Sequence, residues 1–112
     1  MPNPYISGTG VFLAPRVVTN DELSSYMDTT DEWVQERTGI KERRYVEKGV
    51  GPSDLAIPAT EQALESAGLK VSDIDFIIFA TSTPDFYAPG SGCIIQEKMG
   101  FNEIDELEVR DQ

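Results

Sequence analysis

The fold is decided by the stretch Asp75-Phe76-Ile77-Ile78-Phe79-Ala80-Thr81, a continuous apolar run rich in β-branched and aromatic residues. It lacks the alternation of a strand that has one face in water, so we expect both of its faces to be buried. This pattern is typical of a central strand in a parallel sheet. The polar residues 81–85 follow at its carboxyl end, where open α/β sheets place their ligands.

A helix is predicted on the N-terminal side of this strand, over residues 53–67, with Gly68 as its stop. Its apolar stripe repeats every four residues and consists of Leu55, Ala59, Ala63 and Ala67. Asp54 is the predicted cap, which would place Pro58 in the first turn, where little N–H bonding is lost.

Two further elements follow the central strand. Residues 90–99 predict a helix that Gly100 ends, and the alternation of Leu107 and Val109 with charged residues predicts another strand. Units of strand and helix in alternation indicate the α/β class.

The first half of the chain carries weaker signals. Residues 5–13 are expected to form a strand, with Gly8 and Gly10 marking a bulge or a close approach of another backbone. A short helix is expected to start at Asn20, and residues 41–45 to be extended.

Another helix begins at residues 29–32 in our interpretation. Thr29 and Glu32 have the spacing of a capping box, and Gly39 stands where a left-handed stop is expected.

Composition narrows the function. The chain has 112 residues, enough for one domain, and nine Lys and Arg against twenty Asp and Glu give a net charge of -11. Such a charge argues against nucleic acid and anionic membranes as partners. There is no apolar run of about 20 residues and no signal-peptide pattern at the start. With Cys93 as the single cysteine, we expect a cytoplasmic protein.

The residue types also limit the chemistry. There is no histidine, so the chain alone cannot supply a Ser-His-Asp or Cys-His arrangement or a histidine zinc site. Cys93 begins a predicted helix, but it lies among Gly92, Ile94 and Ile95. We therefore interpret it as a buried thiol rather than a nucleophile.

Trp33 and Arg37 are the most informative pair. At spacing i,i+4 they share one helix face and could hold a flat ring such as adenine by stacking and cation–π attraction. The alternative is that Trp33 is a core or interface tryptophan and that Arg37 is a solvated partner of Glu36 or Asp31. The residues alone favour this alternative.

A basic cluster is unusual in so acidic a chain. It could receive a phosphate or an acidic carrier protein, or it could be a solvated edge strand. Its members are Lys41, Arg43 and Arg44.

Several blocks together carry a resemblance to a known family. They read Ile6-Ser7-Gly8-Thr9-Gly10, Val18-Thr19-Asn20-Asp21-Glu22-Leu23, Asp28-Thr29-Thr30-Asp31-Glu32-Trp33-Val34-Gln35-Glu36-Arg37-Thr38-Gly39-Ile40-Lys41-Glu42-Arg43, and Ala80-Thr81-Ser82-Thr83-Pro84-Asp85 with Pro89. Over essentially the whole chain they closely resemble the beginning of β-ketoacyl-acyl-carrier-protein synthase III.

The resemblance implies a thiolase-like layered αβαβα fold made of two similar α/β halves, in a homodimer. Residues 1–112 would be the N-terminal part of the N-terminal domain, only the front part of the first half. The implied reaction condenses an acyl-CoA with malonyl-acyl carrier protein through an acyl-cysteine, without a cofactor. The nucleophilic cysteine is expected immediately after Gln112, so no catalytic residue is expected in this chain. Activity would need the remaining segment of the enzyme.

The resemblance also assigns roles to residues. Trp33 and Arg37 match the residues that sandwich the CoA adenine, and Thr29 matches a nearby CoA contact. The segment around residues 81–89 would line the acyl pocket and cross the dimer interface. Its candidate residues are Phe86, Tyr87 and Ala88.

Ala88 departs from the family pattern, in which a bulky phenylalanine often precedes the proline. The smaller side chain could admit a longer or branched acyl group, or Phe86 and Tyr87 could fill the space.

Two other functions stay open at this stage. A related acyltransferase could pass the acyl group to an alcohol, an amine or another acceptor. A non-catalytic module that binds acyl-CoA or carrier protein would lack the cysteine.

Overall fold

The computed structural model describes residues 3–85, 90–101 and 104–109. The chain divides into two compact units, residues 13–49 and residues 1–12 together with 50–112. We call them the small unit and the large unit.

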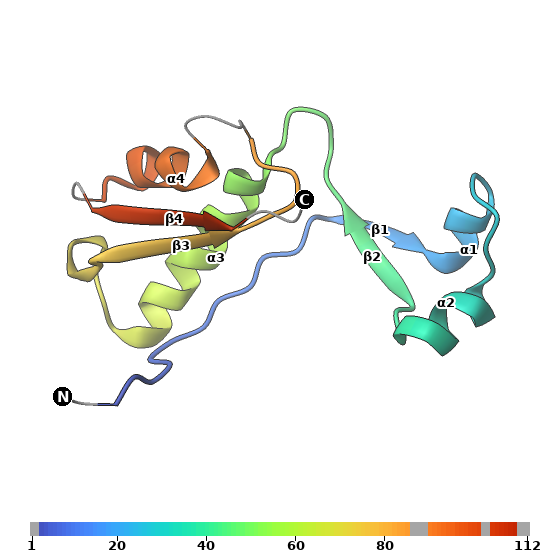
Figure 1. Cartoon of the computed structure of the whole chain (residues 1–112), viewed down its shortest axis with the longest axis horizontal. Helices are drawn as coiled ribbons and strands as arrows, with labels where there is room; N and C mark the ends of the chain where they lie inside the picture. The colour runs from blue at the N-terminus through green and yellow to red at the C-terminus, as the bar shows by residue number, and fades with distance from the viewer. Residues whose placement is uncertain (1–2, 86–89, 102–103, 110–112) are drawn as a thin grey trace. The chain divides into compact units, whose positions relative to one another are not determined.

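The small unit is a two-stranded antiparallel sheet with two short helices (Figure 1). Val18 lies opposite Arg43 in the sheet, and its side chain is fully buried. The elements are β1 (Arg16–Thr19), α1 (Asn20–Ser24), α2 (Asp31–Thr38) and β2 (Glu42–Tyr45). The expected short helix, the second helix and the extended segment are confirmed, whereas β1 was not predicted.

The predicted cap of α2 is wrong by one residue. Thr30, not Thr29, is the N-cap, and its hydroxyl accepts a hydrogen bond from the Trp33 N–H at 3.2 Å. Thr29 belongs to the preceding turn, since its own N–H donates to the carbonyl of Met27 at 3.0 Å. The stop at Gly39 is confirmed, with a left-handed φ of 72° that favours glycine.

The large unit contains both predicted strands, and they pair with each other in parallel. In their register Ile78 stands opposite Leu107. The elements are α3 (Pro52–Ala67), a 3-10 turn (Val71–Asp73), β3 (Phe76–Ala80), α4 (Ser91–Met99) and β4 (Asp105–Val109). Parallel strands joined by a helical connection confirm the α/β class.

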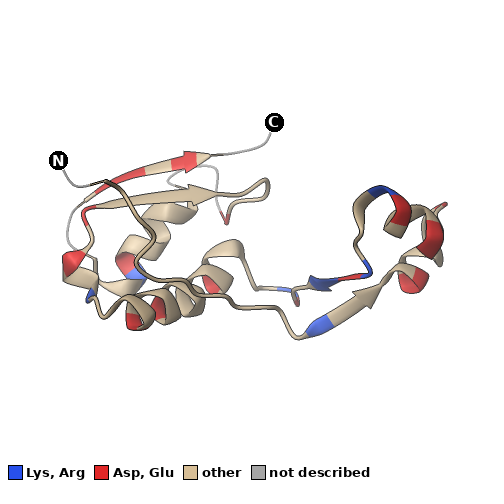
Figure 2. Ribbon diagram, turned by 90° about the horizontal axis from the view of Figure 1, so that it is seen from below, with Lys and Arg blue, Asp and Glu red and all other residues tan. Residues whose placement is uncertain are grey.

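The expectation that both faces of β3 are buried is wrong for this chain. Ile77 and Phe79 are partly covered, whereas Phe76 is 49% exposed and Ile78 is 67% exposed. Figure 2 shows the two helices of this unit on one side of the strand pair. Among the described residues nothing covers the other side, so the apolar run meets water there.

The expected strand over residues 5–13 is also absent, because the main chain there pairs with a helix instead of a strand. The Val11 N–H donates to the side-chain oxygen of Gln62 in α3 at 2.7 Å. A Cβ atom on Gly8 would come within 2.5 Å of the Ala63 carbonyl oxygen, and Gly10 is crowded by Ala59 in the same way. The glycines therefore mark a close backbone approach, as one of the two expectations had it.

Pro58 lies deeper in α3 than predicted. The helix begins at Pro52 after the N-cap Gly51, so Pro58 falls in the second turn and removes one N–H from the helix. Asp54 is not the cap residue but the third helical residue, and its carboxylate accepts the Gly51 N–H at 2.9 Å.

Candidate functional site

Trp33 and Arg37 lie on one face of α2 and contact each other. The guanidinium carbon of Arg37 lies 4.7 Å from the centre of the indole ring, a cation–π distance, and Trp33 is 53% exposed. This exposure argues against a core tryptophan. A flat ring can enter between the two groups only if the guanidinium lifts off the indole, whose face would then be free for stacking.

A buried amide holds α2 in place. Asn20 is 1% exposed, and its side-chain NH2 donates at 2.8 Å both to the carboxylate of Asp31 and to the carbonyl of Ile40. Its side-chain oxygen accepts from the guanidinium of Arg43 at 2.6 Å. The two ends of α2 are thus tied to one side chain, which orients the helix face that carries Trp33.

Asp31 is engaged by this arrangement rather than by Arg37. Hydrogen bonds from the side chains of Gln35 and Asn20 lower the pKa of the Asp31 carboxyl. Of the two partners that the alternative offered Arg37, Glu36 or Asp31, the described contacts of the Asp31 carboxylate are with Asn20 and Gln35. Sequence reasoning recognised Asn20 only as a helix start, because its partners are up to 23 residues away.

Thr29 precedes α2 and is partly buried. Within the described part of the chain its hydroxyl oxygen is buried without a hydrogen-bond partner. Its assignment as a CoA contact stays a prediction.

Two members of the basic cluster have structural partners. Arg43 also donates to the carbonyl of Val18 at 3.1 Å, and Arg44 donates to the carbonyl of Ala14 at 3.0 Å. Main-chain carbonyls thus take part of the hydrogen-bonding capacity of both guanidiniums, and Arg43 is partly buried.

Basic residues are nevertheless concentrated in the small unit (Figure 2). Residues 13–49 contain six of the nine Lys and Arg with eight Asp and Glu, and the rest of the chain contains three with twelve. A ligand carrying phosphates meets less repulsion at the small unit than at the large one.

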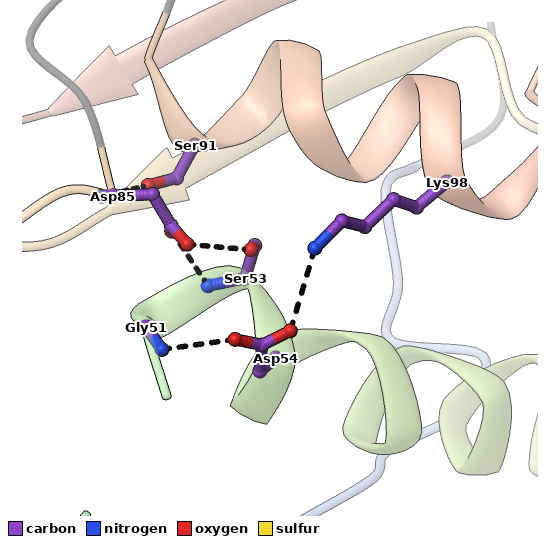
Figure 3. Close-up of polar contacts among 6 residues, drawn as sticks. All are labelled: Gly51, Ser53, Asp54, Asp85, Ser91 and Lys98. Atoms are coloured by element: carbon purple, nitrogen blue, oxygen red, sulfur yellow. Dashed lines mark hydrogen bonds and ion pairs between the residues drawn. The ribbon is translucent and has the colours of Figure 1, made fainter. Parts of the chain in front are cut away.

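A second polar cluster lies at the carboxyl end of β3, and sequence reasoning missed it (Figure 3). The Asp85 carboxylate accepts from the Ser53 N–H at 2.9 Å and from the hydroxyls of Ser53 and Ser91, both at 2.8 Å. The Asp85 N–H donates back to the Ser91 hydroxyl oxygen at 2.9 Å. Both serines are fully buried.

The carboxylate of this cluster is held in its charged form. Burial raises the pKa of Asp85, but the hydrogen bonds from Ser53 and Ser91 outweigh burial and leave the pKa lowered. The signal that sequence reasoning could have used is the aspartate two residues after Thr83, in the polar loop that follows a parallel strand.

Cys93 has the surroundings of an unreactive thiol. Its Sγ donates to a carboxylate oxygen of Glu106 at 2.8 Å. This hydrogen bond, partial burial and the charges of Glu106 and Glu108 raise the pKa of the thiol. A raised pKa disfavours the thiolate, which is the nucleophilic form, so the structure supports the interpretation that Cys93 is not a nucleophile. The thiol is only partly buried, so the expectation of a buried thiol is met in part.

The predicted acyl-pocket residues cannot be placed, since Phe86, Tyr87 and Ala88 lie outside the described residues. In the large unit a cavity of about 310 Å³ lies between α3 and the strand pair, with Leu64, Phe79 and Ile95 in its apolar lining.

Among the described residues no three His, Cys, Asp or Glu side chains are grouped as metal ligands, and no helix is long and apolar enough to cross a membrane.

Comparison with known proteins shows the class of protein. The chain is 37% identical to 3-oxoacyl-[acyl-carrier-protein] synthase III from Aquifex aeolicus, with a TM-score of 0.82 over 95% of this chain and 34% of that one. It is 28% identical to the priming β-ketosynthase of the R1128 polyketide pathway, with a TM-score of 0.82 over 95% and 32%. The chain therefore has the fold of the corresponding part of these synthases, and the predicted thiolase-like α/β fold is confirmed.

A curated relative shows the same similarity at higher identity. Over 96 residues the chain is 50% identical to β-ketoacyl-[acyl-carrier-protein] synthase III of Hyphomonas neptunium, a match that covers 86% of this chain and 30% of the relative. The chain is thus a homologue of β-ketoacyl-acyl-carrier-protein synthase III, as the resemblance implied, and spans about a third of its length. No family model matches the chain.

Proposed function

We propose that the protein carrying this chain is an acyltransferase of fatty-acid or polyketide biosynthesis that condenses an acyl-CoA with malonyl-acyl carrier protein. The observation that carries this proposal is the 50% identity to a synthase III over 96 residues. The polyketide branch of this proposal is supported by the likeness to the priming β-ketosynthase.

The proposed reaction has two steps. A cysteine sulfur, which the resemblance places directly after Gln112, attacks the acyl carbonyl of acyl-CoA, and the bond to the CoA sulfur breaks as the thiol leaves. Malonyl-acyl carrier protein then loses carbon dioxide, and its carbanion carbon attacks the acyl-enzyme carbonyl and releases the cysteine thiolate.

In this proposal the small unit binds the CoA nucleotide. Trp33 would stack on the adenine, Arg37 would move from the indole onto the ring or a phosphate, and Thr29 would contact the nucleotide nearby. Support comes from the exposed indole, its contact with the guanidinium at 4.7 Å, and the higher density of basic residues in this unit.

The acyl pocket and the dimer interface are assigned by resemblance to Phe86, Tyr87 and Ala88. We propose a homodimer that receives acyl carrier protein as its second substrate. Since Arg43 and Arg44 each donate to main-chain carbonyls, we do not assign the carrier-docking patch to them alone.

The test uses the full-length protein. Incubation with acetyl-CoA should add one acetyl group, found by peptide mapping on a cysteine after Gln112, and added malonyl-acyl carrier protein should release carbon dioxide. The variant Cys93→Ala should acylate like the wild type, because Cys93 is not the nucleophile.

The outcomes separate the alternatives. Acylation followed by transfer to an alcohol or amine without release of carbon dioxide would indicate the related acyltransferase. CoA binding without any acyl-enzyme would indicate a binding module and would overturn the proposed reaction.

A further inference from the structure

The helix that carries Trp33 and Arg37 has little apolar anchoring. The structure describes all eight residues of α2, and none of them is fully buried. Burial of an apolar face, which holds most helices of globular proteins in place, therefore contributes little to the orientation of α2. The direction of its exposed face depends instead on hydrogen bonds to residues outside the helix.

Asn20 supplies such hydrogen bonds at both ends of α2. Its side-chain NH2 donates at 2.8 Å to the carboxylate of Asp31, the first residue of the helix. Beyond the last residue, the same NH2 group donates to the Ile40 carbonyl at 2.8 Å, and the Asn20 main-chain N–H donates to the Lys41 carbonyl at 3.3 Å. We call these three contacts the Asn20 clamp.

The groups of the clamp are themselves held in place. Asn20 is 1% exposed, and its side-chain oxygen accepts from the Arg43 guanidinium at 2.6 Å. Both carboxylate oxygens of Asp31 accept from the side-chain nitrogen of Gln35 at 2.8 Å. Because a buried amide cannot turn without breaking several hydrogen bonds at once, Asn20 is a fixed point for both ends of α2.

The clamp and the candidate nucleotide-binding face lie on opposite sides of α2. Asp31 and Gln35 have the spacing i,i+4 and share the side that meets Asn20. Trp33 and Arg37 have the same spacing but are displaced by two residues, which is about 200° around the helix axis. A rotation of α2 about its axis would therefore move the indole and the guanidinium directly.

We infer that Asn20 is a positioning residue for the CoA nucleotide, because its clamp fixes the direction in which α2 presents Trp33 and Arg37. This inference rests on the proposed function, in which these two side chains bind the adenine. Asn20 is buried on the opposite side of the helix, so it acts on the nucleotide through α2 and not by contact.

The experiment compares two thioester substrates of the full-length protein. Acetyl-CoA carries the nucleotide and acetyl-pantetheine lacks it, so the ratio of their kcat/KM values measures what the nucleotide contributes. Asp31→Ala removes the clamp contact at the start of α2 and should lower this ratio about fivefold, and Asn20→Ala should lower it about tenfold, as the loss of a stacked base does. A merely structural role would lower both kcat/KM values alike and leave the ratio unchanged.

Three further variants make the test specific. Glu32→Ala removes an exposed carboxylate from the same turn of α2 and should leave the ratio within about twofold of the wild type. Asp31→Asn keeps a side-chain oxygen that can accept from Asn20, so its ratio should stay near that of the wild type. In a Trp33→Ala background, the effect of Asp31→Ala should shrink to about twofold or less, because both changes act on one binding face.

The failures are distinguishable. If Trp33→Ala lowers the ratio but neither Asn20→Ala nor Asp31→Ala does, the inference is overturned and the proposed function stays intact. If Asn20→Ala does not fold, the partly buried Asp31 decides the test through Asp31→Ala alone. A wild type that does not favour acetyl-CoA over acetyl-pantetheine would overturn the nucleotide site and the inference with it. A wild type that transfers no acyl group from either thioester would overturn the proposed reaction as well.

Discussion

The two units solve the problem of burial in opposite ways. The small unit surrounds one buried amide, Asn20, with partners from its own 13–49 stretch, and every polar atom of that side chain is used. The large unit leaves the apolar side of β3 and β4 exposed and buries two serines against partly exposed carboxylates at the strand ends. The first unit completes its polar centre by itself, whereas the second presents an apolar sheet face that, within the described residues, has no cover.

The largest effect should come from removing the centre of the small unit. Asn20→Ala would remove a fully buried amide and leave Asp31, Arg43 and the Ile40 carbonyl without their shared partner. We expect the free energy of unfolding to fall by about 3 kcal/mol, measured by urea denaturation of the full-length protein.

The control is Ser24→Ala, which removes an exposed hydroxyl bonded to the Asp21 carbonyl and should cost less than about 0.5 kcal/mol. If both variants cost the same, Asn20 is not the centre of the small unit.

A smaller effect is expected from crowding the large unit. Gly10→Ala would drive a Cβ atom into the backbone of α3 at Ala59 and Ala63. We expect a loss of about 2 kcal/mol, seen as a lower thermal midpoint. Its exposed neighbour supplies the control, since Thr9→Ala should be nearly neutral. A neutral Gly10→Ala would mean that the N-terminal segment does not lie against α3.

The next variant should change binding and not stability. Trp33→Ala removes a half-exposed ring, so unfolding should hardly change, while the proposed stacking on adenine is lost. We expect the Kd for CoA, measured by calorimetry, to rise about tenfold. Glu36→Ala, on the same exposed helix, should bind CoA at least as well as the wild type. An unchanged Kd in Trp33→Ala would mean that the CoA nucleotide does not bind to this face of α2.

The smallest effect should be on the pH dependence of the free energy of unfolding. Hydrogen bonds lower the pKa of Asp31 in the small unit and of Asp54 and Asp85 in the large unit. Lowered pKa values stabilise the fold above the unfolded value of about 4, and this stabilisation is lost as the pH falls through the folded values. Stability measured from pH 5 downward should therefore decline, and less steeply in Asp31→Asn or Asp85→Asn. A slope identical to that of the wild type would contradict these pKa directions.

Elements set by local signals were predictable. Gly39, Gly68 and Gly100 each end a helix in the left-handed conformation, as expected from the sequence. The apolar run of β3 and the alternation in β4 were sufficient to predict the two strands. These features depend on neighbours within a few residues.

Features set by distant contacts were not predictable from one sequence. Residues 5–13 have the composition of a strand, but they lie against α3 because Gly8 and Gly10 permit that contact. Asp85 sits 32 residues from Ser53, and no local pattern announces that pairing. The Trp33 and Arg37 pair was found because both residues lie within one helical turn.

The hydrogen bond by which Asp85 caps the first turn of α3 has a kinetic consequence. Gly51 has no side chain to cap α3, so the first turn of the helix is capped by the Asp85 carboxylate. This contact can form only after β3 has formed and the loop that follows it has closed. A peptide of residues 50–68 should therefore be frayed at its start, and Asp85→Ala should accelerate unfolding of the full-length protein more than it slows refolding. The N-terminal capping of α3 therefore depends on a residue outside the helix, both in the folded structure and during folding.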